Sequence, residues 1–139
     1  GDKLIDGRIV KNFSLTEMMN NQADDDVKLV ITPELVEHAF MIQELRDWYG
    51  KPLNVSSWYR TKSFNKQVGG HSNSCHLDGL ATDLNNIPQS LYNDFTLAWE
   101  VICLSHGKIG GVEFYSWGMH FDSNSDRFGY KKFRKKENR

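Results

Sequence analysis

Apolar residues recur at helical spacing in two long stretches of the chain, residues 33–49 and about 89–105. Thr32–Pro33 supplies a cap and a first-turn proline at the start of the first stretch, and Gly50 ends it. Gly107 follows the second stretch in the same way. Each stretch therefore predicts a helix that packs on a core. The predicted core positions are Leu35, Val36, Ala39, Ile42, Leu45 and Trp48 or Tyr49 in the first helix, and Leu91, Phe95, Ala98, Ile102 and Cys103 in the second.

Four shorter segments have the alternating or continuous apolar pattern of β-strands. They are residues 53–58, 79–85, 109–115 and 119–122. A further helix start is predicted at residues 14–17, where serine and glutamate have the spacing of a capping box. These elements together predict an α+β fold, with a small, mainly antiparallel sheet and helices packed on one side.

The last two predicted strands form a hairpin with a polar face. If Trp117 and Gly118 make a two-residue turn, Tyr115 pairs with His120 and Glu113 pairs with Asp122. Paired residues share a face, and so do residues two apart along a strand. We therefore expect these two pairs to project from one side of the sheet. An ordinary solvated hairpin has the same composition, so this pattern alone does not define a site.

Composition and charge narrow the class of protein. The chain has 139 residues, of which 39% are hydrophobic and 25% charged, and this is typical of a globular domain. Its formal net charge of −1 gives no electrostatic basis for binding nucleic acid. No apolar run approaches the roughly 18 residues that span a bilayer, and no signal peptide is recognised. We expect one monomeric domain over residues 1–139, with its core at about 11–123, no nucleic-acid partner and no membrane span.

The basic C-terminal tail and the two cysteines are each expected to have no catalytic role. The tail, residues 130–139, contains the run Lys131–Lys136 and is expected to be a solvated terminus. The alternative is attraction to an anionic polymer, such as a cell wall or nucleic acid. Cys75 and Cys103 are expected to be reduced packing thiols, because two cysteines form no disulfide framework.

Two histidines and one carboxylate carry the strongest candidate chemistry. His76 and Asp83 lie seven residues apart, and His120 follows in the last predicted strand. Two imidazoles and a carboxylate are a familiar zinc donor set that leaves one position open, as catalytic zinc requires. A bend is needed to bring His76 and Asp83 to one ion, and Gly79 between them permits it.

The spacing of these residues resembles a known motif. Ser74-x-His76-x-x-Gly79-x-Ala81-x-Asp83 matches the S-x-H-x-x-G-x-A-x-D motif of the zinc D-alanyl-D-alanine carboxypeptidase family, which includes related peptidoglycan endopeptidases. The resemblance covers roughly residues 11–123. It is also carried by Asn12–Met18, by Ser57–Arg60 with Asn65, Val68, Gly69 and Gly70, and by Met119–Asp122, which is similar to the late histidine segment of the family.

The resemblance implies a Hedgehog/DD-peptidase-like fold and a single zinc ion. The ion would be held by His76, Asp83 and His120. Arg60 corresponds to the family arginine that binds substrate and stabilises a developing oxyanion, a role that suits a fixed guanidinium.

The general base is the point where the chain departs from the family pattern. Many members carry an acidic residue three positions before the last zinc histidine, and Trp117 stands there in this chain. Asp122 and Glu113 are the two candidate replacements on the predicted hairpin face. Asp122 is slightly favoured, although it equally suits a group that orients an imidazole.

For function, the resemblance implies hydrolysis of a peptide bond in peptidoglycan stem or cross-bridge peptides. The enzyme would be a D-Ala-D-Ala carboxypeptidase or an endopeptidase such as a phage lysin, phage-encoded or bacterial, acting in the cell wall or periplasm. Because Trp117 replaces the usual acid, the alternative is a non-catalytic, zinc-stabilised domain that binds cell walls or a partner. A nucleic-acid binder acting through the basic tail ranks last.

Overall fold

The computed structural model describes residues 8–19, 31–59, 76, 79–123 and 134–136. In chain order the elements are β1 (Arg8–Val10), β2 (Phe13–Ser14), α1 (Leu15–Met18), α2 (Pro33–Tyr49), β3 (Val55–Ser57), β4 (Ala81–Leu84), the 3-10 turn η2 (Gln89–Leu91), α4 (Tyr92–Ser105), β5 (Gly111–Tyr115), β6 (Gly118–Asp122) and β7 (Arg134–Lys136).

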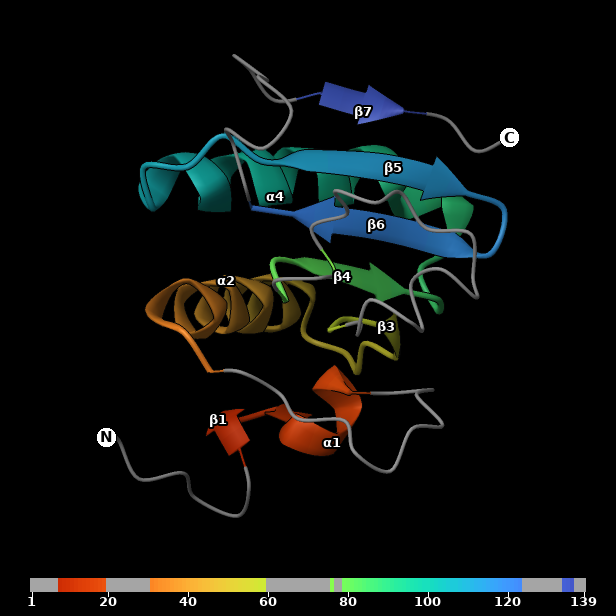
Figure 1. The fold of residues 1–139 in the computed structure, drawn as a ribbon. Helices are drawn as coiled ribbons and strands as arrows, with labels where there is room; N and C mark the ends of the chain where they lie inside the picture. Colours follow the sequence, from red (N-terminus) through yellow and green to blue (C-terminus); the bar gives the residue numbers. More distant parts are fainter. Residues whose placement is uncertain (1–7, 20–30, 60–75, 77–78, 124–133, 137–139) are drawn as a thin grey trace.

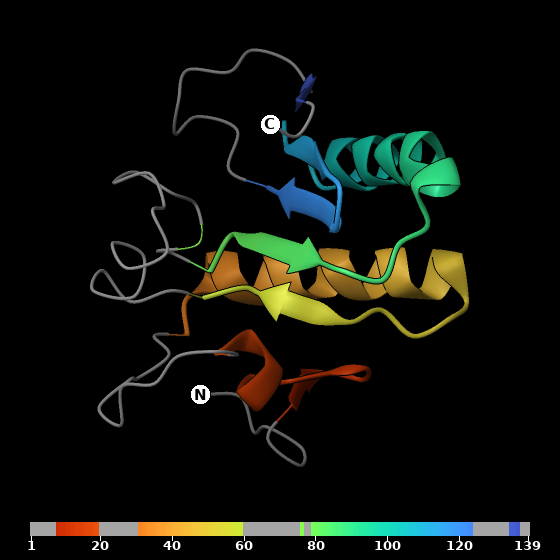
Figure 2. The same cartoon turned by 90° about the vertical axis from the view of Figure 1, so that its right-hand side faces the viewer.

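The centre of the fold is a five-stranded sheet in the order β3-β4-β6-β5-β7. Its strands pair antiparallel except for β5 and β7, which run parallel. Helices α2 and α4 lie side by side over one face of this sheet, as Figures 1 and 2 show. The predicted α+β class, with helices on one side of a mainly antiparallel sheet, is confirmed.

Three short strands have no counterpart in the sequence-based expectation. β1 and β2 form a separate two-stranded sheet, and β7 adds to the edge of the main sheet beside β5. The prediction for the basic terminus did not include the strand that residues 134–136 form. Their pairing with β5 satisfies backbone groups that an edge strand otherwise leaves open.

The helix boundaries follow their predicted capping signals. The Thr32 side chain accepts a hydrogen bond from the Leu35 amide at 3.1 Å, and Pro33 is the first helical residue of α2. Gly50 ends α2 in the left-handed conformation, with φ of 75°. At α1, Ser14 and Glu17 form the predicted capping box.

The core lies between the helices and the sheet. The side chains of Trp99, Phe95 and Phe121 are fully buried and pack against one another. Most predicted core positions of α2 are buried as expected, but Trp48 is 50% exposed. Cys103 is buried and forms no disulfide, as predicted, whereas Cys75 lies outside the described residues.

A buried histidine ties α2 to the sheet beneath the candidate site. The His38 side chain is fully buried; its Nδ1 lies 2.6 Å from Ser123 Oγ and its Nε2 3.0 Å from Thr82 Oγ1. Burial, together with charge at His76 and His120, lowers the pKa of His38 to about 3. A neutral imidazole can donate from one nitrogen and accept at the other, so both hydroxyl contacts are satisfied.

None of the described helices is long and apolar enough to cross a membrane.

Candidate metal centre

The β5–β6 hairpin places its polar residues on the sheet face opposite the helices. Glu113 pairs with His120, Gly111 with Asp122, and Tyr115 with Gly118. The predicted register is therefore wrong by two residues, and the two-residue turn consists of Ser116 and Trp117. A shift of two leaves every side chain on its face, so the predicted common face of Glu113, Tyr115, His120 and Asp122 is confirmed.

Strand pairing brings the three predicted metal ligands together. His120 on β6 is the Cα partner of Asp83 on β4, and both side chains project from the face away from α2 and α4. Asp83 Oδ1 lies 3.2 Å from His76 Nε2 and 3.0 Å from His120 Nδ1. One ligand atom from each residue lies within 4.8 Å of the other two. His76, Asp83 and His120 thus converge on one point, although they are far apart in the chain.

The histidine that precedes the strand is positioned by a tight bend. Gly79 has φ of 73°, and its amide donates a hydrogen bond to the His76 carbonyl at 3.1 Å. A Cβ at Gly79 would lie 2.4 Å from Leu35 Cδ1, so any larger residue would collide with α2. The predicted glycine bend is confirmed, and it turns the chain from His76 into β4.

Each histidine makes an outer hydrogen bond that fixes its tautomer. His76 Nδ1 donates to the Trp58 carbonyl at 2.6 Å, so the lone pair of its Nε2 faces Asp83. His120 Nε2 donates to Asp122 Oδ2 at 3.1 Å, so its Nδ1 is the ring nitrogen that faces Asp83. One nitrogen of each imidazole and an anionic oxygen therefore face the same small volume, where a proton or a metal ion can lie between them.

This donor set fits a zinc ion. Three electron-rich atoms this close repel one another unless a proton or a metal ion lies between them. Ligands at the usual zinc distances of about 2.0–2.2 Å in a tetrahedron stand roughly 3.3–3.6 Å apart. The measured separations of 3.2 and 3.0 Å at Asp83 are close to that edge. Two imidazoles and one carboxylate, each nitrogen oriented by an outer partner, form the donor set of a hydrolytic zinc site.

The electrostatics of the cluster favour a bound cation. Burial opposes ionisation of Asp83, but the neighbouring His76 and the hydrogen bonds from His120 and His76 outweigh it and lower the pKa of Asp83. Burial likewise disfavours charge on His120, but its hydrogen bonds to Asp122 and Asp83 raise the pKa of His120 to about 10. The two carboxylates therefore create a site that attracts a proton or, in competition with it, a metal ion.

The two candidate bases have different surroundings. The Asp122 side chain is buried; its Oδ2 is engaged by His120, and its Oδ1 has no hydrogen-bond partner among the residues that the structure describes. Glu113 is only partly buried, and its carboxylate accepts a hydrogen bond from the Tyr115 hydroxyl. Arg60, the predicted substrate-binding arginine, lies outside the described residues.

Trp58 contributes to the site in a way that sequence reasoning missed. Besides accepting from His76, it donates from its indole Nε1 to the Gly79 carbonyl at 2.9 Å, and its ring is fully buried. It therefore holds both ends of the bend that carries His76. The signal was present, because Trp58 lies inside the Ser57–Arg60 segment on which the family resemblance rests.

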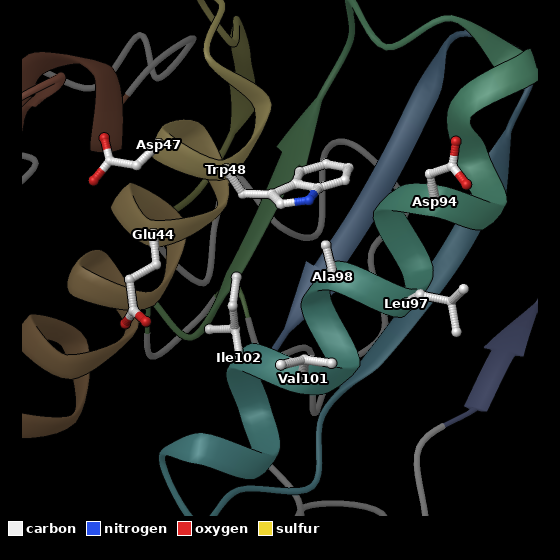
Figure 3. A pocket seen from close by; sticks show the side chains of 8 residues that line it. All are labelled: Glu44, Asp47, Trp48, Asp94, Leu97, Ala98, Val101 and Ile102. Carbon is white, nitrogen blue, oxygen red and sulfur yellow. The ribbon is translucent and has the colours of Figure 1, made fainter.

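A groove of about 640 Å³ lies on the other side of the molecule. Figure 3 shows it between α2 and α4, with Trp48, Ala98 and Ile102 among its lining residues. It contains none of the clustered metal-ligand candidates and lies on the helix layer, whereas those side chains project from the opposite face of the sheet. The groove is therefore separate from the candidate metal centre.

A two-histidine, one-carboxylate cluster on an α+β sheet is the donor set that small metal-dependent hydrolases use. Comparison with known families agrees: the sequence model of Peptidase M15 matches residues 11–115, and the chain belongs to that family. No curated protein sequence matches the chain. The family resemblance seen in the sequence is thus confirmed, and membership supports a metallopeptidase with a peptide substrate.

Proposed function

We propose that the protein is a zinc peptidase that hydrolyses a peptide bond in peptidoglycan stem or cross-bridge peptides. The observation that carries the proposal is the convergence of His76, Asp83 and His120 in a chain of the Peptidase M15 family. The chemistry that a zinc ion supplies when bound there is Lewis acidity, which activates water and polarises the scissile carbonyl.

Three residues around the centre have separate roles in the proposed reaction. Asp122 orients His120 through the hydrogen bond from Nε2, so that Nδ1 keeps its lone pair for the metal. Glu113 accepts the proton of the attacking water and passes it to the leaving amine. Arg60 binds the negative charge that develops on the carbonyl oxygen, as the family resemblance implies.

Glu113 is the better candidate base for two reasons. It is the Cα partner of His120, so its side chain stands beside the imidazole on the open face of the sheet. It is also only partly buried, whereas Asp122 is buried and already engaged by His120. A base must reach within about 3 Å of the water that it deprotonates, and a partly exposed side chain can move to do so.

Peptidoglycan cleavage is the decisive experiment. Zinc-loaded protein is incubated with purified peptidoglycan and the fragments are identified by mass, beside His120→Ala and a matched control, His106→Ala. His106 lies outside the metal cluster, at the end of α4, where it contacts Glu37 and Glu44. New fragments from the wild type and His106→Ala, absent with His120→Ala, support the proposal, and their masses identify the bond.

The second candidate is a non-catalytic domain that binds peptidoglycan peptides. It is favoured by Trp117, which stands where many relatives carry the acid and cannot accept a proton. Stoichiometric zinc with no fragments from any peptidoglycan type would contradict the peptidase proposal and support this one.

A further inference from the structure

We propose that Tyr115 and Trp117 form a carbohydrate-binding platform that holds a sugar ring of the glycan to which the substrate peptide is attached. The inference rests on the proposed function for its setting, because it places the platform beside a centre that cuts sugar-linked peptides. The term platform is used here for these two side chains alone.

The platform is a stacked aromatic pair of which the partly buried Tyr115 supports the exposed Trp117. The Tyr115 and Trp117 rings are stacked, with centroids 4.8 Å apart and an interplanar angle of 9°. Trp117 nevertheless remains 44% exposed. Because one face of a stacked ring is covered by its neighbour, the exposed area of the indole includes its other face.

Several contacts hold this pair in place. The Tyr115 hydroxyl donates to Glu113, and the Tyr115 carbonyl accepts from the Tyr92 hydroxyl at 2.6 Å. The next carbonyl along the turn, that of Ser116, accepts from Gln89 Nε2 at 3.3 Å. Residues of η2 and α4 thus hold the turn in place. Binding of a ligand to the rings therefore costs little conformational entropy of the protein.

The turn is also locked against the neighbouring strand. A Cβ at Gly118 would lie 2.1 Å from the Leu84 carbonyl oxygen, so glycine permits the close approach of β6 to the end of β4. The exposed indole therefore belongs to a well-anchored hairpin end.

The position of the platform connects it to the metal centre. Glu113 is the Cα partner of His120, and Tyr115 lies two residues further along β5 on the same face. Two strand residues span about 7 Å, so the platform begins about 7 Å along the sheet from the position opposite the metal-ligand candidate His120. A substrate bound at the centre reaches the rings without leaving this face of the sheet.

A pyranose ring matches the chemistry of this surface. Its C–H face is apolar and flat enough to stack on an indole, while its hydroxyls remain at the rim in contact with water. An extended peptide presents alternating side chains and has no comparable flat face. Leaving a large aromatic side chain open to water costs hydrophobic free energy, and such anchored aromatic rings are typical of binding sites.

Trp48 provides a matched control. It is also an exposed tryptophan, at 50%, and its ring stacks with the neighbouring Tyr49 at 6.4 Å. It lies on the helix layer in the groove of Figure 3, on the side opposite the metal ligands. Trp48→Ala therefore removes the same side chain at similar exposure without touching the platform.

The kinetic test compares a disaccharide-linked stem peptide with the same peptide freed from its sugar. We expect the wild type to have a KM about tenfold lower for the linked substrate, the size of one stacking contact. In Trp117→Ala the ratio of the two KM values falls to about one, Trp117→Phe keeps most of it, and Trp48→Ala keeps all of it. An equal rise of both KM values in Trp117→Ala would mean that the rings contact the peptide, and two unchanged KM values would mean that they contact neither part of the substrate; either result overturns the proposal.

A binding test separates this proposal from the proposed function. Glycan oligosaccharides without peptide are added to ¹⁵N-labelled protein, whose four tryptophan indole signals are assigned with Trp→Phe variants. A selective shift of the Trp117 signal supports the platform, even if no peptide is ever cleaved. Cleavage of both substrates without any such shift would leave the peptidase proposal standing and refute the platform.

Discussion

At the scale of single residues, the two carboxylates of the hairpin differ in what they contact. Asp122 accepts a hydrogen bond from His120 Nε2, whereas Glu113 accepts one from the Tyr115 hydroxyl. The first contact orients a metal ligand, and the second leaves a carboxylate on the open face beside it. Their substitution should therefore affect different properties of the enzyme.

We predict that Glu113→Gln lowers kcat by about 10²–10⁴-fold with little change in zinc affinity, because it removes a proton acceptor and leaves the His120–Asp122 hydrogen bond in place. Asp122→Asn should weaken zinc binding by about 10–100-fold, with activity largely restored at saturating zinc. Zinc competition with a chelating dye and kcat at saturating zinc measure the two properties. The reverse pattern would assign the base to Asp122.

The convergence of the metal ligands could be predicted only as a motif. Residue types and spacing indicated His76, Asp83 and His120, but the sequence carries no distance between residues 83 and 120. That distance follows from the pairing of β4 with β6, a long-range contact that local patterns do not encode. The part played by Asp122 was easier to foresee, since residues two apart on a strand share a face.

At the scale of elements, the hairpin shows which part of a register prediction is robust. The turn was placed one residue too far along the chain, so the pairing moved by two residues. Side chains alternate with a period of two, and the predicted polar face survived the error. β1, β2 and β7 are two or three residues long, too short to show any alternation, and they were missed.

The contact between the two helices gives an element-scale prediction. His106, which caps α4, lies 3.1 Å from Glu37 and 2.5 Å from Glu44, both on α2. Burial lowers its pKa, but the hydrogen bonds to Glu44 and Glu37, together with the negative charges of these groups, outweigh this effect and raise the pKa of His106. A raised pKa means that the folded state binds the proton more tightly, so the stabilisation is complete below about pH 6.5 and is lost as the pH rises through the raised value.

We therefore expect His106→Gln to lower the free energy of unfolding by about 0.2–1 kcal/mol at pH 6, the range for partly exposed ion pairs. The difference from the wild type should disappear as the pH is raised well above the raised pKa of His106. Urea denaturation at a series of pH values measures it. Asp94→Asn, an exposed change on α4, is the control; a His106→Gln deficit that grows with pH would have the wrong sign.

At the scale of the whole molecule, the hydrophobic pattern predicted the packing of helices on the sheet better than the positions of residues at the ends of the elements. Long amphipathic helices show their buried stripe over several turns, so the packing of α2 and α4 on one side of the sheet could be predicted. His38 lies on that stripe, between Leu35 and Ile42, and its burial agrees with the periodicity. Of the two alternatives at the end of the stripe, Tyr49 packs against the core, whereas Trp48 is exposed and lines the groove.

The metal ligands also connect distant parts of the chain, and this gives a prediction for the stability of the whole fold. His76 precedes β4, Asp83 lies on it, and His120 lies on β6, so the three atoms meet only in the folded state. Zinc at 100 times its dissociation constant should then stabilise the protein by about 2.7 kcal/mol, which raises the Tm by roughly 10 °C.

Thermal unfolding with zinc and with a chelator measures this shift. It should be smaller at pH 6 than at pH 8, because the pKa of about 10 at His120 means that the ion must displace a proton, and that displacement costs more in acid. His120→Ala should abolish the shift, and His106→Ala should keep it despite a lower starting Tm. A wild-type Tm that does not respond to zinc would show that the three side chains do not bind the ion in the folded protein. A response retained in His120→Ala would place the bound ion elsewhere.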